Sequence, residues 1–85
     1  MQYHEPYDKL PDAIKDQTRA INSLREELEA IDWYDQRAAI VNDQELKKIL
    51  EHNRDEEKEH AAMLIEWLRK HDKEFDRQFS EHDQV

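Results

Sequence analysis

Apolar positions recur at steps of three and four along two long stretches of the chain. The first stretch carries its stripe at Ile14, Ile21, Leu24, Leu28, Ile31 and Ala38. The second carries an inward stripe that is apolar except for Asn53, Glu57, His60 and His71. Its members are Leu46, Leu50, Asn53, Glu57, His60, Leu64, Trp67, His71 and Phe75. Both stripes follow the helical period, and the second is close to a heptad seam. The pattern predicts one helix over residues 10–40 and another over 44–76.

Helix-breaking residues are confined to the start of the chain. Glycine is absent, and the only prolines are Pro6 and Pro11. Residues 1–9 are polar and lack a period, so we expect an N-terminal arm, and Pro11 suits a first helical turn. A short connection follows the first helix, where Asn42 or Asp43 can cap the second. We expect one domain over residues 1–85, composed of arm 1–9, helix 10–40, helix 44–76 and frayed tail 77–85.

A hairpin of two such helices leaves broad apolar faces in water when it is alone. Each helix of about 30 residues extends roughly 45 Å, and a chain of 85 residues buries only a modest core by itself. Pairing of two hairpins covers these faces. We therefore expect an all-α fold, a two-helix antiparallel hairpin that dimerises into a four-helix bundle.

The charge balance narrows the range of partners. Charged residues make up 41% of the chain, and the formal net charge is −9. Phosphate backbones are bound by Lys and Arg, so a nucleic-acid partner is not expected, whereas an acidic surface attracts cations. The absence of cysteine excludes disulfides and thiolate ligands. No apolar run reaches the length of a membrane span and no signal peptide is recognisable, so we expect a soluble cytoplasmic protein without a membrane partner.

Polar residues occupy the centre of the second seam, where leucines are normally found. Glu57 and His60 are three residues apart and share one helix face. Glu27 belongs to a parallel stripe on the first helix, which also contains Tyr34. Burying an ionised carboxylate is costly unless it is paired or bound to a cation, so these residues are candidate metal ligands.

The ligand set is that of the ferritin-like di-metal bundles. Such bundles place a Glu on two helices and a Glu-x-x-His on the other two. A twofold dimer of this chain supplies both halves, giving four Glu and two His. Carboxylates with imidazole and no sulfur suit iron or manganese, and they also bind zinc. Calcium suits the carboxylates but not His60.

Other interpretations of the same residues remain open. Glu-x-x-His arises by chance in a Glu-rich chain, and polar seam residues can set helix register in a structural or adaptor hairpin. Glu56 is an alternative partner of His60 at a spacing of four. The same ligands also suit a di-metal enzyme acting on an organic substrate or peroxide. Glu26 and Glu29 form either a solvated acidic face or a cation-collecting site, with Trp33 nearby as a packing residue.

Three segments of the chain resemble the encapsulated ferritins, two-helix members of the ferritin-like superfamily found as cargo of encapsulin nanocompartments in bacteria and archaea. The segments are EELEAIDWYDQR (Glu26–Arg37), HNRDEEKEHAAM (His52–Met63) and EWLR (Glu66–Arg69). The resemblance extends over most of residues 21–70. It implies a ferroxidase centre at a dimer interface and an annular decamer built as five dimers.

The resemblance also implies roles for individual residues. Glu27, Glu57 and His60 match the iron ligands, with Glu57 as the bridging carboxylate, and Tyr34 matches a tyrosine close to the centre. Glu26 and Glu29 match an acidic pair that attracts incoming metal, with Trp33 beside it. Iron storage inside an encapsulin shell in the cytoplasm is implied as well. No shell-docking peptide is recognisable in the final SEHDQV, and the arm residues His4 and Glu5 have no assigned role.

Overall fold

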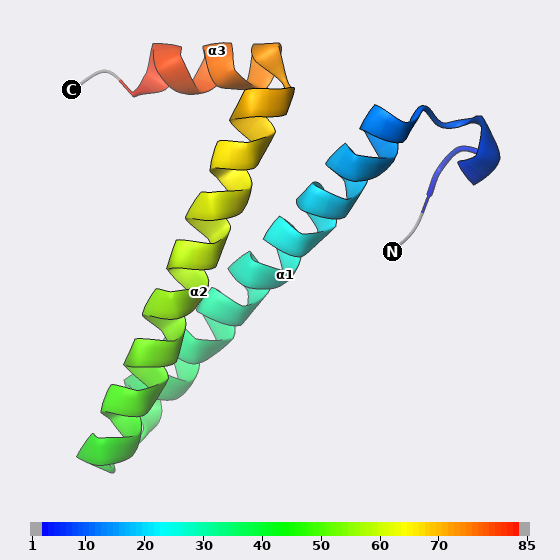
Figure 1. Cartoon of the computed structure of the whole chain (residues 1–85). Coiled ribbons are helices and arrows are strands. Elements are labelled where there is room, and N and C mark those ends of the chain that lie inside the picture. The colour runs from blue at the N-terminus through cyan, green and yellow to red at the C-terminus, as the bar shows by residue number, and fades with distance from the viewer. Residues whose placement is uncertain (1–2, 84–85) are drawn as a thin grey trace.

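Two long antiparallel helices dominate the computed structural model, which describes residues 3–83 (Figure 1). The element order is the 3₁₀ turn η1 (Tyr7–Lys9), then α1 (Asp12–Ile40), α2 (Gln44–His71) and α3 (Lys73–His82). Within the described residues there is no β-strand. The expected all-α class and the helical hairpin are confirmed.

Local sequence explains where α1 begins and ends and where α2 begins. α1 begins directly after Pro11, whose carbonyl accepts hydrogen bonds from the backbone N–H groups of Ile14 and Lys15. It ends at Ile40, and the backbone of Val41 after it is extended. Asp43 then caps α2, because its Oδ1 accepts a hydrogen bond from the backbone N–H of Leu46 at 3.0 Å. The connection therefore turns without glycine.

Replacement of Asp43 by Ala is expected to lower the free energy of unfolding by about 1 kcal/mol, because the first turn of α2 loses its side-chain acceptor. The loss is measured by urea unfolding at a fixed chain concentration. Asn42→Ala is the matched control, since the Asn42 side chain makes no cap hydrogen bond. Equal destabilisation by both variants would contradict the assignment of Asp43 as the cap.

The second helix ends earlier than its stripe predicts. α2 stops at His71, and the backbone of Asp72 is extended, with φ −140° and ψ 100°. Asp72 Oδ1 accepts a hydrogen bond from the N–H of Phe75 at 3.0 Å, so Asp72 begins a new helix. The predicted continuous helix over 44–76 is therefore wrong, and α3 turns sharply away from the axis of α2 (Figure 1).

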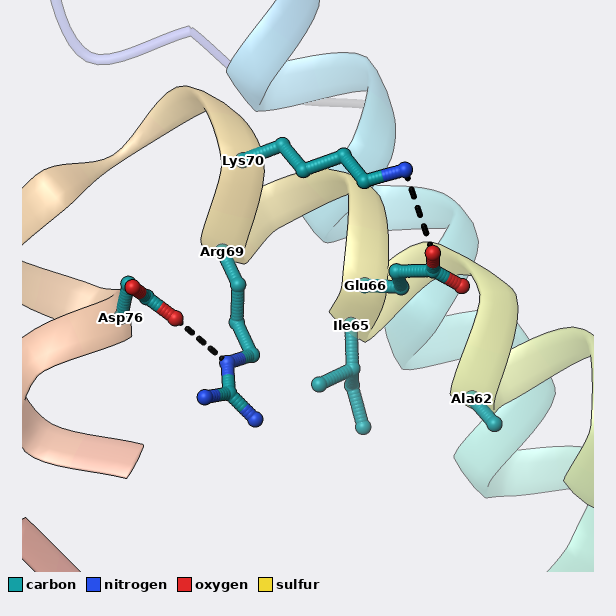
Figure 2. Close-up of a pocket in the computed structure, with 6 residues that line it drawn as sticks. All are labelled: Ala62, Ile65, Glu66, Arg69, Lys70 and Asp76. Atoms are coloured by element: carbon teal, nitrogen blue, oxygen red, sulfur yellow. Dashed lines mark hydrogen bonds and ion pairs between the residues drawn. The ribbon is translucent and has the colours of Figure 1, made fainter. Parts of the chain in front are cut away.

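The predicted frayed tail is also wrong for most of its length, because α3 continues to His82. Arg69 of α2 holds α3 in place, because its Nε lies 2.7 Å from Asp76 Oδ1 (Figure 2). The Arg69 guanidinium also lies over the ring of Phe79. Within α3, Arg77 pairs with both Glu74 and Glu81. At the other end of the chain, part of the expected arm forms η1, and α1 starts at Asp12 rather than at residue 10.

The buried core of the hairpin is thin. Among the described residues, only Ala20, Ala38, Ala61 and Leu68 are buried. The accessible surface is 6840 Å², whereas a compact monomer of this mass exposes about 5,400 Å². The radius of gyration is 16.5 Å, against about 12 Å for a compact domain of this length. Large apolar side chains thus remain uncovered in the single chain, notably Ile21, Leu28, Ile49 and Met63.

The helices do not have the character of membrane spans. Within residues 3–83, none combines the length and the apolar composition needed to cross a bilayer.

Candidate metal centre

Three potential metal ligands converge midway along the hairpin. Glu27 comes from α1, while Glu57 and His60 come from adjacent turns of α2. One ligand atom from each of the three lies within 4.8 Å of the others. His60 Nδ1 lies 3.6 Å from Glu57 Oε2 and 3.7 Å from Glu27 Oε2. The structure therefore brings together the three residues that the sequence analysis chose as ligands.

Helix geometry explains the convergence. Glu57 and His60 project from one face of α2 because residues three apart are neighbours on a helix surface. Glu27 lies on the side of α1 that faces α2, the side that also carries the buried Ala20 and Ala38. The α2 pair is therefore set by local structure, whereas its meeting with Glu27 depends on how the two helices are aligned.

The carboxylate of Glu27 contains an unsatisfied hydrogen-bond acceptor. Its Oε2 is buried and accepts no hydrogen bond. The contact to His60 at 3.7 Å is too long to be one. A buried carboxylate oxygen without a donor is strongly disfavoured unless a cation neutralises it.

The spacing of the ligand atoms fits a shared metal ion. Metal–ligand bonds of about 2.1 Å at a tetrahedral angle separate two ligand atoms by about 3.4 Å, close to the 3.6 and 3.7 Å found here. Two carboxylates and one imidazole suit iron, manganese or zinc. The residues present thus fit a transition-metal ion, and three protein ligands leave part of its coordination sphere open.

The centre lies at an open edge of the hairpin. The side chains of Glu27 and Glu57 are 23% and 26% exposed, but that of His60 is 47% exposed. Trp67 and Met63 lie on the turns of α2 that follow His60. The ligands are therefore accessible to a second molecule from the side of His60.

The other residues predicted for the site lie outside this cluster. Tyr34 is half-buried two turns after Glu27, with the guanidinium of Arg37 over its ring. No hydrogen bond among residues 3–83 joins the Tyr34 hydroxyl to the three ligands. Glu26 and Glu29 are exposed on α1, and neither belongs to the converging group. Successive residues of a helix are 100° apart, so Glu26 projects from a different face than Glu27.

Trp33 is 49% exposed and follows Glu29 by about one turn. It is thus placed beside the acidic pair rather than in the core of the hairpin. The arm residues His4 and Glu5 are likewise exposed.

The alternative partner of His60 is engaged elsewhere. Glu56 Oε1 lies 3.0 Å from His52 Nε2 and does not join the cluster. This pair was not among the predicted contacts, although its spacing of four is the usual one for a helical contact.

An ion pair between the helices was also missed. Arg54 Nη1 lies 3.1 Å from Asp35 Oδ1. The one sequence feature that could have predicted this ion pair is the presence of opposite charges at matching positions of the two antiparallel helices.

Comparison with known proteins shows which family the chain belongs to. The sequence profile of the EncFtn-like family matches residues 2–83. A ferritin-like protein of Thermotoga maritima is 59% identical over 69 residues, which cover 81% of this chain and 60% of that protein. An encapsulated ferritin-like protein of Rhodospirillum rubrum is also 59% identical over 69 residues, covering 81% of this chain and 49% of its own length. The chain thus spans about half to three fifths of these relatives.

A solved structure shows the same fold. The crystal structure of a protein from Nitrosomonas europaea superposes with a TM-score of 0.91 at 56% sequence identity, covering 96% of this chain and 90% of that one. With the profile match across nearly its whole length, the chain belongs to the EncFtn-like family, a group of ferritin-like helical proteins.

Proposed function

We propose that this chain is a ferroxidase subunit, which binds Fe(II) and passes its electrons to dioxygen at a di-iron centre shared between two copies. The observation that carries the proposal is the buried, unpartnered Oε2 of Glu27, which faces Glu57 and His60. A cation at that point would remove the cost of the buried charge. Membership of a ferritin-like family supports iron as that cation.

Two copies are needed because one chain supplies only part of the ligand set. Its three ligands lie at an edge where His60 is 47% exposed, and large apolar side chains around that edge remain uncovered. A twofold axis beside His60 would double the ligands and cover those side chains. The doubled set then matches the two Glu and two Glu-x-x-His motifs of a di-iron bundle.

The carboxylates of the doubled site would set the charge balance around bound iron. Four ionised carboxylates balance the charge of two Fe(II) ions, and the imidazoles add none. Oxidation to Fe(III) leaves a positive excess that the protein ligands do not neutralise. The carboxylates would stabilise the positive charge that develops on oxidation, and the excess would favour loss of protons from water at the site.

The remaining predicted residues take supporting roles in the proposal. In the proposal Glu57 would be shared by the two irons, Glu27 and His60 would complete the ligands of each one, and Tyr34 would lie near the centre. Glu26 and Glu29, with Trp33 beside them, collect incoming Fe(II) on the outer face of α1. Their exposure supports this role, since an exposed acidic pair concentrates cations without holding them tightly.

We further propose that the subunit works inside a protein compartment. The Rhodospirillum rubrum relative is an encapsulated ferritin-like protein, and an open two-helix subunit encloses no space for mineral. An encapsulin shell in the cytoplasm would receive the Fe(III), with the subunits arranged as five dimers in a ring.

An anaerobic Fe(II) titration followed by admission of air tests the ferroxidase directly. Binding is expected to saturate near one iron per chain, since two irons serve two chains. Oxidation is expected to be much faster than that of Fe(II) in buffer. Oxidation at the buffer rate, without saturable binding, would overturn the proposal and favour a helical adaptor whose polar seam residues only set register.

A further inference from the structure

Three contacts tie α1 to α2 in a single antiparallel alignment. The first lies at the open end of the hairpin, where Gln17 Nε2 donates to the carbonyl of His71 at 3.1 Å. The second is the approach of His60 to Glu27 at 3.7 Å. The third lies nearer the connection, where Arg54 Nη1 is 3.1 Å from Asp35 Oδ1.

Apolar packing specifies this alignment only weakly. Three of the four buried residues are alanines, Ala20, Ala38 and Ala61. Their methyl groups are too small to lock into one set of holes on the facing helix, unlike the large side chains of a coiled-coil seam. A slip of one helical turn moves α1 by about 5.4 Å along α2. That shift would carry Glu27 out of reach of its partners, whose ligand atoms lie within 4.8 Å.

We propose that Arg54, acting through Asp35, is a positioning residue that sets the helix alignment at which Glu27 meets Glu57 and His60. This inference rests on the proposed metal site. Arg54 is well suited to the task, because its side chain is only 22% exposed and lies one turn before Glu57 on α2.

A second hydrogen bond makes the guanidinium rigid. Arg54 Nε donates to Asp55 Oδ1 at 3.1 Å on its own helix, while Nη1 reaches Asp35 on the other. Both bonds raise the pKa of Arg54 above its ordinary value, so its charge is permanent. A planar guanidinium that is hydrogen-bonded to both helices fixes the distance between them more closely than the flexible ammonium group of a lysine would.

The role is alignment rather than stability. An ion pair near the surface adds little to the free energy of unfolding. Simple electrostatics also predicts the opposite sign for a charge change: removing a cation one turn from Glu57 should strengthen metal binding. The positioning role predicts weaker metal binding by Arg54→Glu, so this variant separates the two explanations.

Four variants test the inference by Co(II) titration, followed by the visible absorption of the bound ion. Arg54→Glu and Asp35→Arg are each expected to weaken binding by roughly tenfold, at the lower end of the effect of groups that orient metal ligands. The double variant D35R/R54E keeps the net charge of the parent and is expected to recover most of that loss. Lys58→Glu is the matched control, because Lys58 adjoins Glu57 and, among residues 3–83, pairs only with Asp55 on its own helix. It should bind Co(II) as well as the parent or better.

Three outcomes are decisive, provided that helix content and oligomer size match the parent. Tighter binding by Arg54→Glu, equal to that of Lys58→Glu, would overturn the positioning role and leave the metal site intact. Loss in both single variants without recovery in the double would also overturn it. Failure of the parent to bind Co(II) would overturn the metal site and, with it, the inference.

Discussion

Rapid iron oxidation is expected to disappear when Glu57 is replaced by Gln. The substitution keeps the size of the side chain but removes its charge, so each centre loses two of its four carboxylates when two copies combine. Loss of groups that merely orient metal ligands weakens binding by about 10- to 100-fold. Removal of a direct ligand should therefore lower the initial oxidation rate at least about 100-fold, measured by the absorbance of Fe(III) after admission of air.

A matched control separates this effect from a general loss of negative charge. Glu59→Gln makes the same chemical change two residues away, on an exposed side chain that does not join the cluster. It should oxidise iron at the rate of the parent. Equal rates for Glu57→Gln and the parent, at the same oligomer size, would show that oxidation takes place elsewhere.

Leu68→Ala is expected to produce the largest loss of stability. Leu68 is 2% exposed, the most buried side chain among the described residues, and it is the only large one in the core. Truncation of a buried leucine costs about 2–5 kcal/mol. We expect the lower half of that range, since two helices with small residues between them can partly close the gap. Urea unfolding at a fixed chain concentration measures the change, because oligomerisation adds to apparent stability.

The control for this prediction is Ile40→Ala at the end of α1. Ile40 is 81% exposed, so its truncation should change the free energy of unfolding by less than about 0.5 kcal/mol. Comparable losses in the two variants would indicate that Leu68 is not the centre of the core, or that Ile40 is covered in the assembled protein.

Local features of the chain were predictable because they depend on neighbouring residues. The three-and-four spacing of apolar residues predicted the two long helices, and α1 ends where expected, at Ile40. The side chain of Asp43 caps α2, one of the two choices offered by the sequence. The pairing of Glu57 with His60 on one helix face also follows from spacing alone.

The bend at Asp72 between α2 and α3 was not predicted, although the residues that favour it are close in sequence. The apolar stripe continues in step through His71 to Phe75, so periodicity favoured one uninterrupted helix. Asp72 has low helix propensity and is followed by acidic residues at Glu74 and Asp76, a pattern that also suits a helix start. The apolar stripe favours a continuous helix, whereas Asp72 and the acidic residues after it favour a new helix start. The ion pair between Arg69 and Asp76 favours the new start, because it forms only when the chain bends.

An acidic helical hairpin with a carboxylate–imidazole pair at the centre of its second helix follows from composition and residue spacing alone. A helical period determines which direction each side chain points around its own axis. It does not determine how far one helix lies along another, since the small alanine side chains between them allow several alignments. The meeting of Glu27 with Glu57 and His60 is visible only in the folded hairpin, because it depends on contacts between the helices such as Asp35–Arg54.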